Sequence, residues 1–237
     1  MKKLTKQELS FLIINLALIT LNFILNYFYQ KNGFDFTLKC ICSRIFALIG
    51  VINLTFALLR KAENKTFYIL MTCGLIFAML GDVVINHYFV PGAGLFAIGH
   101  VFFVISFCLL SKIKLIDIIP TSILAVGAVS FLLFAKILHF DPSMLKIVCI
   151  IYALIISCML GKTIGNFINN KSTLNILIMI GAALFFFSDL MLVLDWFILE
   201  QYEMSWTNEA CMATYYPALC IFAFSMYYKL VLENKNN

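Results

Sequence analysis

Long apolar runs, separated by short polar segments, make up most of this chain of 237 residues. Each run has roughly the 20 residues that a helix needs to cross a hydrocarbon core of roughly 30 Å. None of them shows the short alternating pattern of membrane barrel strands, so every run is predicted to be helical. The eight predicted spans cover residues 9–29, 38–59, 67–89, 93–111, 115–136, 144–162, 173–199 and 209–231.

Composition supports this interpretation, since 63% of the residues are hydrophobic, 12% are charged and the mean hydropathy is +0.99. Such values exclude a soluble domain. We therefore predict an all-α polytopic membrane protein, with residues 1–237 forming a single integral membrane domain. The net charge of +5 does not indicate a nucleic-acid partner, because the basic residues lie between the apolar runs, where they orient helices.

The distribution of lysine and arginine predicts the orientation of the chain. Eight spans place both termini on one side, and with the N-terminus inside, twelve basic residues fall on the inner side and five on the outer side. The positive-inside rule therefore predicts that both termini are cytoplasmic. Frequent Lys, Asn and Ile are typical of an AT-rich bacterial genome, which favours the cytoplasmic membrane of a bacterium.

Three asparagines in the first span form a polar stripe. Asn15, Asn22 and Asn26 are spaced by seven and four residues and so lie on one helical face. An unpaired amide in hydrocarbon is costly, so this stripe is predicted to face other helices rather than lipid.

Two aspartates occupy matching positions deep in the third and seventh spans. In both spans a glycine is followed, eight residues later, by the acid: Gly74 precedes Asp82, and Gly181 precedes Asp189. A carboxylate in an apolar helix is expensive to bury and by default marks a functional site. The two spans run in the same direction, which indicates a weak parallel repeat of four plus four helices and one site shared by both aspartates.

Further polar residues are expected at the depth of the aspartates, in the outer half of the membrane. His100 lies about two turns into the fourth span, and Asn86 is expected one helical turn beyond Asp82 on the same face. Lys39 and Arg44 either reach to the interface as anchors or hold an anionic headgroup. The second and eighth spans also bring Ser43, Tyr215 and Tyr216 to this level.

An ordered set of motifs gives the chain a resemblance to a known family. The motifs are Gly81-Asp82, Gly99-His100 with Phe103, Gly181 with Phe187-Ser188-Asp189, and Thr214-Tyr215-Tyr216-Pro217-Ala218. With these motifs, over residues 38–231, the chain resembles the YhhN family of bacterial and animal membrane proteins, which includes lysoplasmalogenases. It departs from the family at Cys40, where proline is common, and at Leu219, where glutamine is common.

The resemblance implies hydrolysis of the vinyl ether bond of a lysoplasmalogen, which gives a fatty aldehyde and glycerophospho-ethanolamine or -choline. This reaction needs a general acid, a negative group near the oxocarbenium ion, and a water. Asp82 and Asp189 are the candidates for the first two roles, and His100 for orienting the water or moving the proton. The candidate substrate-binding residues are Lys39, Arg44, Asn86, Tyr215 and Tyr216. The expected partners are a lysophospholipid substrate and membrane lipid, with no cofactor or metal.

Two other functions remain open from the residues alone. Three histidines, together with the two aspartates, would suit a zinc-dependent lipid hydrolase. Alternatively, paired intramembrane aspartates in a possible repeat suit a proton-coupled transporter. Metal analysis with chelation would test the first alternative, and uptake by proteoliposomes the second. The three histidines in question are His87, His100 and His139.

Overall fold

The computed structural model describes residues 4–202 and 204–233. Eight of its helices are long and apolar enough to cross a membrane, and the regular structure of the described residues is helical, as predicted. The helices are α1 (Lys6–Lys31), α2 (Phe36–Leu59), α3 (Lys65–Val84), α4 (Phe89–Leu110), α5 (Leu115–Phe134), α6 (Met144–Asn169), α7 (Thr173–Phe197) and α8 (Thr207–Tyr227).

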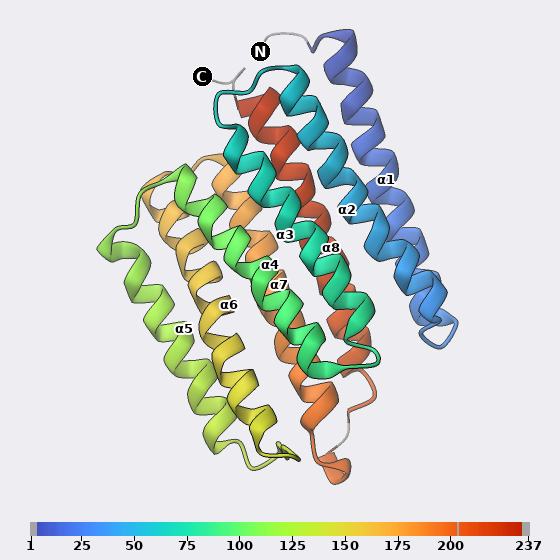
Figure 1. Ribbon diagram of the computed structural model, residues 1–237, viewed down its shortest axis with the longest axis vertical. Coiled ribbons are helices and arrows are strands. Elements are labelled where there is room, and N and C mark those ends of the chain that lie inside the picture. Colours follow the sequence, from blue (N-terminus) through green and yellow to red (C-terminus); the bar gives the residue numbers. More distant parts are fainter. Residues whose placement is uncertain (1–3, 203, 234–237) are drawn as a thin grey trace.

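The helices form a single bundle in which neighbours along the chain run antiparallel (Figure 1). Because the number of spans is even, α1 begins and α8 ends at the same end of the bundle, which we call the terminal end. The opposite end, which we call the distal end, carries the connections from α1 to α2, α3 to α4, α5 to α6 and α7 to α8.

The core of the bundle lies around α8, the most buried of the spans, which packs against α1, α2, α3 and α7. Helices α1 and α5 are the least buried and lie at opposite edges (Figure 1). The packing of the first four helices recurs in the last four: α2 packs against α1, α3 and α8, and α6 packs against α5, α7 and α4. This correspondence supports the predicted division into four plus four helices.

The ends of the third and sixth spans differ most from the predicted boundaries. The third span was expected to reach residue 89, but α3 ends at Val84 and a turn follows, so the expectation that Asn86 continues the helical face of Asp82 is wrong. The chain restarts as α4 at Phe89, with Pro91 in the first turn, where its missing N–H is tolerated. Helix α6 continues to Asn169, past Lys162, because Lys162 is buried against Asp117 at 2.8 Å rather than exposed at a helix end.

The asparagine stripe of α1 faces the protein, as predicted. Asn15 and Asn53 exchange two amide hydrogen bonds of 2.8–2.9 Å, and Asn53 also donates to the carbonyl of Ala223. Asn22 donates to the carbonyl of Cys42, and Asn26 to that of Met212. These bonds tie the edge helix α1 to α2 and α8.

Replacing Asn53 by Leu should lower the free energy of unfolding by about 1–3 kcal/mol, because Asn15 and the Ala223 carbonyl would be left buried without this partner. Thermal unfolding in detergent would measure the change. Thr55→Val is the matched control, since Thr55 is exposed on the same helix and bonds only within its own turn. Equal melting temperatures for the two variants would contradict a stabilising role for these asparagine hydrogen bonds.

Candidate active site

Asp82 lies in the last turn of α3, where both of its carboxylate oxygens are engaged. Lys39 Nζ is 3.1 Å from Oδ1. The hydroxyls of Ser43 and Tyr216 donate to Oδ2 at 2.5 and 3.0 Å. Asp82 is 2% exposed, and the ammonium group of Lys39 beside it offsets the cost of burying a carboxylate there.

The first turns of α2 bring these donors to the aspartate. Lys39 and Ser43 are four residues apart and so share one helical face. Lys39 also donates to the side-chain oxygen of Asn86 at 2.8 Å, which fixes the turn that follows α3. Lys39 is buried, so it does not reach to the interface as an anchor, and its charge is directed at Asp82.

Asp189, two turns before the end of α7, has different partners. The hydroxyl of Tyr152 on α6 donates to Oδ2 at 2.7 Å. His100 Nε2, from the middle of α4, lies 2.7 Å from the same hydroxyl and 3.4 Å from Oδ2. A hydroxyl has only one proton, so while Tyr152 donates to Asp189, His100 must donate to Tyr152 through Nε2–H. Oδ1 of Asp189 has no hydrogen-bond partner among the described residues.

Each aspartate is held by two helices at corresponding positions in the repeat: the preceding helix and one helix of the other half. Asp82 on α3 is bound from the preceding helix, α2, and from α8. Asp189 on α7 is bound from the preceding helix, α6, and from α4. The helices thus correspond, but the chemistry differs: a lysine faces the first aspartate, and a tyrosine and a histidine face the second.

Tyr152 was missed by the sequence analysis. It is one of ten tyrosines, and nothing in its immediate neighbours sets it apart from an ordinary buried aromatic residue. The repeat holds the signal that could have found it, because α6 corresponds to α2, the helix that supplies Lys39 and Ser43.

The two aspartates line one narrow cavity. Lys39, Ser188 and Tyr215 complete its polar lining, and the hydroxyl of Tyr215 donates to the carbonyl of Ala78 at 3.1 Å. The volume of the cavity is about 10 Å³, close to the space that one water occupies.

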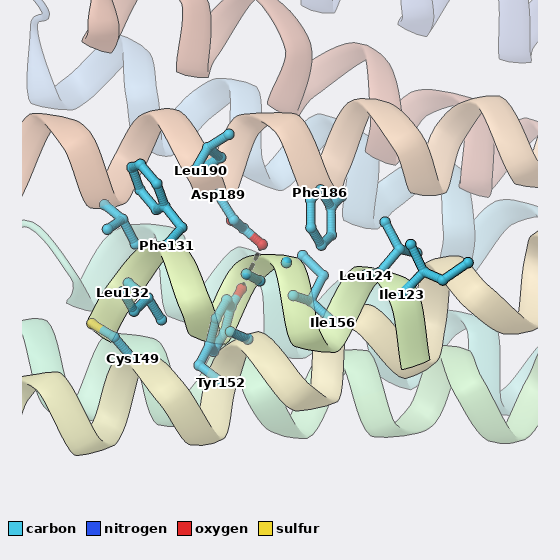
Figure 2. A pocket seen from close by; sticks show the side chains of 14 residues that line it. Ile123, Leu124, Phe131, Leu132, Cys149, Tyr152, Ile156, Phe186, Asp189 and Leu190 are labelled. Atoms are coloured by element: carbon cyan, nitrogen blue, oxygen red, sulfur yellow. Dashed lines mark hydrogen bonds between the residues drawn. The ribbon is translucent and has the colours of Figure 1, made fainter. Parts of the chain in front are cut away.

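Asp189 also borders a larger pocket between α5, α6 and α7, with a volume of about 390 Å³. Figure 2 shows Asp189 and Tyr152 pointing toward each other midway along this pocket, with Leu132 on one side of them and Ile123 on the other. Apart from Asp189 and Tyr152, the pocket is lined by hydrophobic side chains and Gly127. A single carboxyl group therefore faces both a water-sized cavity and an apolar pocket.

Of the remaining candidates, all of which the structure describes, Arg44, His87 and His139 make no contact with the aspartates, whereas His100 lies beside Asp189. Arg44 is exposed on α2, and no hydrogen bond or ion pair joins it to the other candidate residues among those described. His100 lies three turns into α4 rather than two, since the helix begins at Phe89. His87 packs its ring against Phe36, and His139 lies in the α5–α6 connection. In the described part of the chain, no three His, Cys, Asp or Glu side chains are placed to hold a metal ion, so the ligands of the zinc alternative are not assembled.

Comparison with known proteins identifies the family. The sequence pattern of the YhhN family matches residues 42–226, a segment that runs from the second span to the eighth and contains both aspartates, His100 and the two tyrosines of α8. No curated protein matches the chain, and no solved structure does. The match covers most of the sequence, in agreement with the order of the motifs, and the chain therefore belongs to the YhhN family.

Proposed function

We propose that this protein hydrolyses the vinyl ether bond of a lysoplasmalogen within the membrane, as the resemblance to lysoplasmalogenases in its family suggests. The observation that carries the proposal is the position of Asp189, which borders both the water-sized cavity shared with Asp82 and an apolar pocket. Vinyl ether hydrolysis needs a proton donor beside a hydrocarbon chain, with a water close by.

Asp189 acts as the general acid in this proposal. Its proton goes to the β-carbon of the vinyl ether, where the electron pair of the double bond forms the new C–H bond and leaves an oxocarbenium ion. Oδ1 of Asp189 is free to make this transfer, while Oδ2 accepts the bond from Tyr152. The Asp189 carboxylate that results lies beside the new cation and stabilises it.

Asp82 holds the water. As a carboxylate fixed by Lys39 and Tyr216, it can accept a hydrogen bond from a water in the shared cavity. That water adds to the cationic carbon and gives its proton to Asp189, which regenerates the acid. The hemiacetal then breaks its bond to the glycerol oxygen, its hydroxyl proton passes to that oxygen, and the aldehyde leaves.

The membrane orientation is part of the proposal. With the terminal end in the cytoplasm, as the basic residues indicate, the aspartates lie in the half of the bundle toward the outer leaflet. The exposed Trp196, Tyr202 and Trp206 at the distal end suit the membrane interface on that side.

The experiment that tests the function compares three single-chain lipids that differ only in the linkage of the chain: vinyl ether, saturated ether and ester. We expect purified protein to release a fatty aldehyde from the vinyl ether and to leave the saturated ether intact. Cleavage of the ester alone would contradict the proposal. Uptake of a solute by proteoliposomes, without turnover of any of the three lipids, would favour the transporter alternative.

Replacing Tyr152 by Phe should lower kcat for aldehyde release by roughly 10- to 100-fold, because the hydroxyl links the proton donor Asp189 to His100. KM should change little, since the ring that lines the pocket remains. Steady-state kinetics on the purified variant would separate the two parameters. Tyr27→Phe, at an exposed position on α1, is the matched control. A Tyr152→Phe enzyme with wild-type kcat would remove this residue from the proton path.

A further inference from the structure

The pocket between α5, α6 and α7 is an apolar groove with one carboxyl group, that of Asp189, in its wall. Helix α5 contributes a stripe of positions at helical spacing, among them Leu124, Gly127, Ala128 and Phe131. Helix α7 contributes Asp189 on the opposite side (Figure 2).

The groove has an exposed rim at the edge of the bundle where α5 lies. Helix α5 lies at the edge of the bundle and packs along α6, which in turn packs against α7, so α5 is joined to the rest of the protein through α6 (Figure 1). At the rim of the groove, Ile123 is 67% exposed although it lines the pocket. A ligand dissolved in the membrane could therefore reach Asp189 sideways, between α5 and α7.

The position of α5 is fixed by contacts on the side of the pocket toward the terminal end. The Asp117–Lys162 ion pair joins the first turn of α5 to α6 at 2.8 Å. Gly161 and Gly165 of α6 lie directly against Thr121 and Asp117, where a Cβ atom would clash with the α5 backbone. The two helices are thus held together by charge and close packing, which fixes the position of the α5 wall of the groove.

Gly127 is one of the residues that line the hollow. A Cβ atom added at this position would meet nothing within 4 Å, so the space beside Gly127 is open. A glycine in a helix interior costs roughly 0.5–1 kcal/mol relative to alanine, and no close helix contact at Gly127 explains it.

We propose that this groove binds the single hydrocarbon chain of a lysolipid. The lipid enters sideways from the bilayer, between α5 and α7. The first carbons of its chain lie beside Asp189, and the rest of the chain runs past Gly127 toward Ile123. This inference rests on the proposed function, because the bond to be cleaved is at the head of the chain. The volume of about 390 Å³ is near the lower end of the roughly 300–1,000 Å³ of ligand pockets, which favours one chain over two.

The side chains that line the groove indicate which kind of ligand it binds. A polar or charged ligand would leave its groups unpaired against hydrophobic side chains, at a considerable cost. A saturated chain loses nothing there, and only its head would meet the carboxyl group of Asp189 and the hydroxyl of Tyr152. This arrangement matches a lipid with one reactive bond at the top of one chain.

The test uses a saturated 1-O-alkyl lysophospholipid with a photoactivatable diazirine in its chain, because this probe has no vinyl ether and reports binding without turnover. After irradiation in detergent micelles, mass spectrometry should place the label on residues that line the groove, such as Ala128 and Ile156. Excess unlabelled lysophospholipid should compete for this labelling, and a two-chain phospholipid should not.

Gly127→Leu adds a large side chain at a position where a Cβ atom meets nothing within 4 Å, and it should weaken the binding measured by this competition by roughly tenfold or more. Gly94→Leu is the matched control, since this glycine is also in a helix with open space at its Cβ position but does not line the groove. Equal competition curves for Gly127→Leu and the wild type, or equal competition by the two-chain lipid, would overturn the proposal.

The outcome for the groove can be separated from the outcome for the function. Aldehyde release without competed labelling of the groove would overturn the groove proposal and leave the hydrolase in place. Competed labelling that Gly127→Leu abolishes, in a protein that cleaves no vinyl ether, would support the groove as a lysolipid site and remove the proposed function.

Discussion

Asp189→Asn is expected to lower the rate of aldehyde release by roughly 10²- to 10⁴-fold, the usual contribution of a general acid. The amide has nearly the same shape and can still accept the hydrogen bond from Tyr152, so the fold should persist. What is lost is the proton that begins the reaction. The measurement is the initial rate of aldehyde formation by purified protein, with unfolding of each variant monitored in parallel.

The control for this variant is Asp195→Asn, which changes an exposed carboxylate on the same helix, α7. It should retain wild-type activity, because Asp195 accepts a bond from Thr207 at the start of α8 and does not border the pocket. If Asp189→Asn kept full activity while folded, the proton would have to come from another group.

Lys39→Met is expected to have the largest effect on stability, lowering the free energy of unfolding by about 3–5 kcal/mol. Removing one partner of a buried ion pair leaves the other charge uncompensated, and both Lys39 and Asp82 are buried. The double variant Lys39→Met/Asp82→Asn should recover much of this loss, since no unpaired charge is left. Unfolding curves in detergent for the two single variants and the double variant give the coupling energy.

Arg44→Met provides the comparison within α2. Arg44 is exposed one turn beyond Lys39, and its replacement should leave stability close to that of the wild type. A double variant as unstable as the sum of its parts would show that Lys39 and Asp82 contribute independently and would contradict the paired arrangement.

The general architecture could be predicted from the sequence because membrane spans must satisfy their own backbone hydrogen bonds, so length and hydropathy suffice to find helices. The ends of the helices were harder to place. Val84 and Phe89 both lie in apolar sequence, and only the turn between them, which holds Asn86 against Lys39, shows where α3 stops. At Lys162 the reverse occurs: the residue is charged, yet the helix continues through it, because Asp117 neutralises its charge.

The site was predictable only in part, for a physical reason. A buried carboxylate is costly enough that Asp82 and Asp189 stand out in any apolar helix. Burying a tyrosine costs much less, so the sequence did not distinguish Tyr152, although it is the closest partner of Asp189. Hydropathy also fails to separate Lys39, which faces Asp82, from Arg44, which is exposed, because lipid-facing and protein-facing sides of a span are both apolar.

The most direct measurement is hydrolysis of a lysoplasmalogen by the purified protein in deuterated water, followed by mass spectrometry of the aldehyde. Protonation of the vinyl ether by Asp189, whose proton exchanges with solvent, predicts one deuterium on the carbon next to the carbonyl. Aldehyde incubated in the same buffer without protein corrects for slow exchange. A folded protein that releases no aldehyde, or aldehyde that carries no deuterium above this background, would contradict acid-catalysed cleavage at the two aspartates.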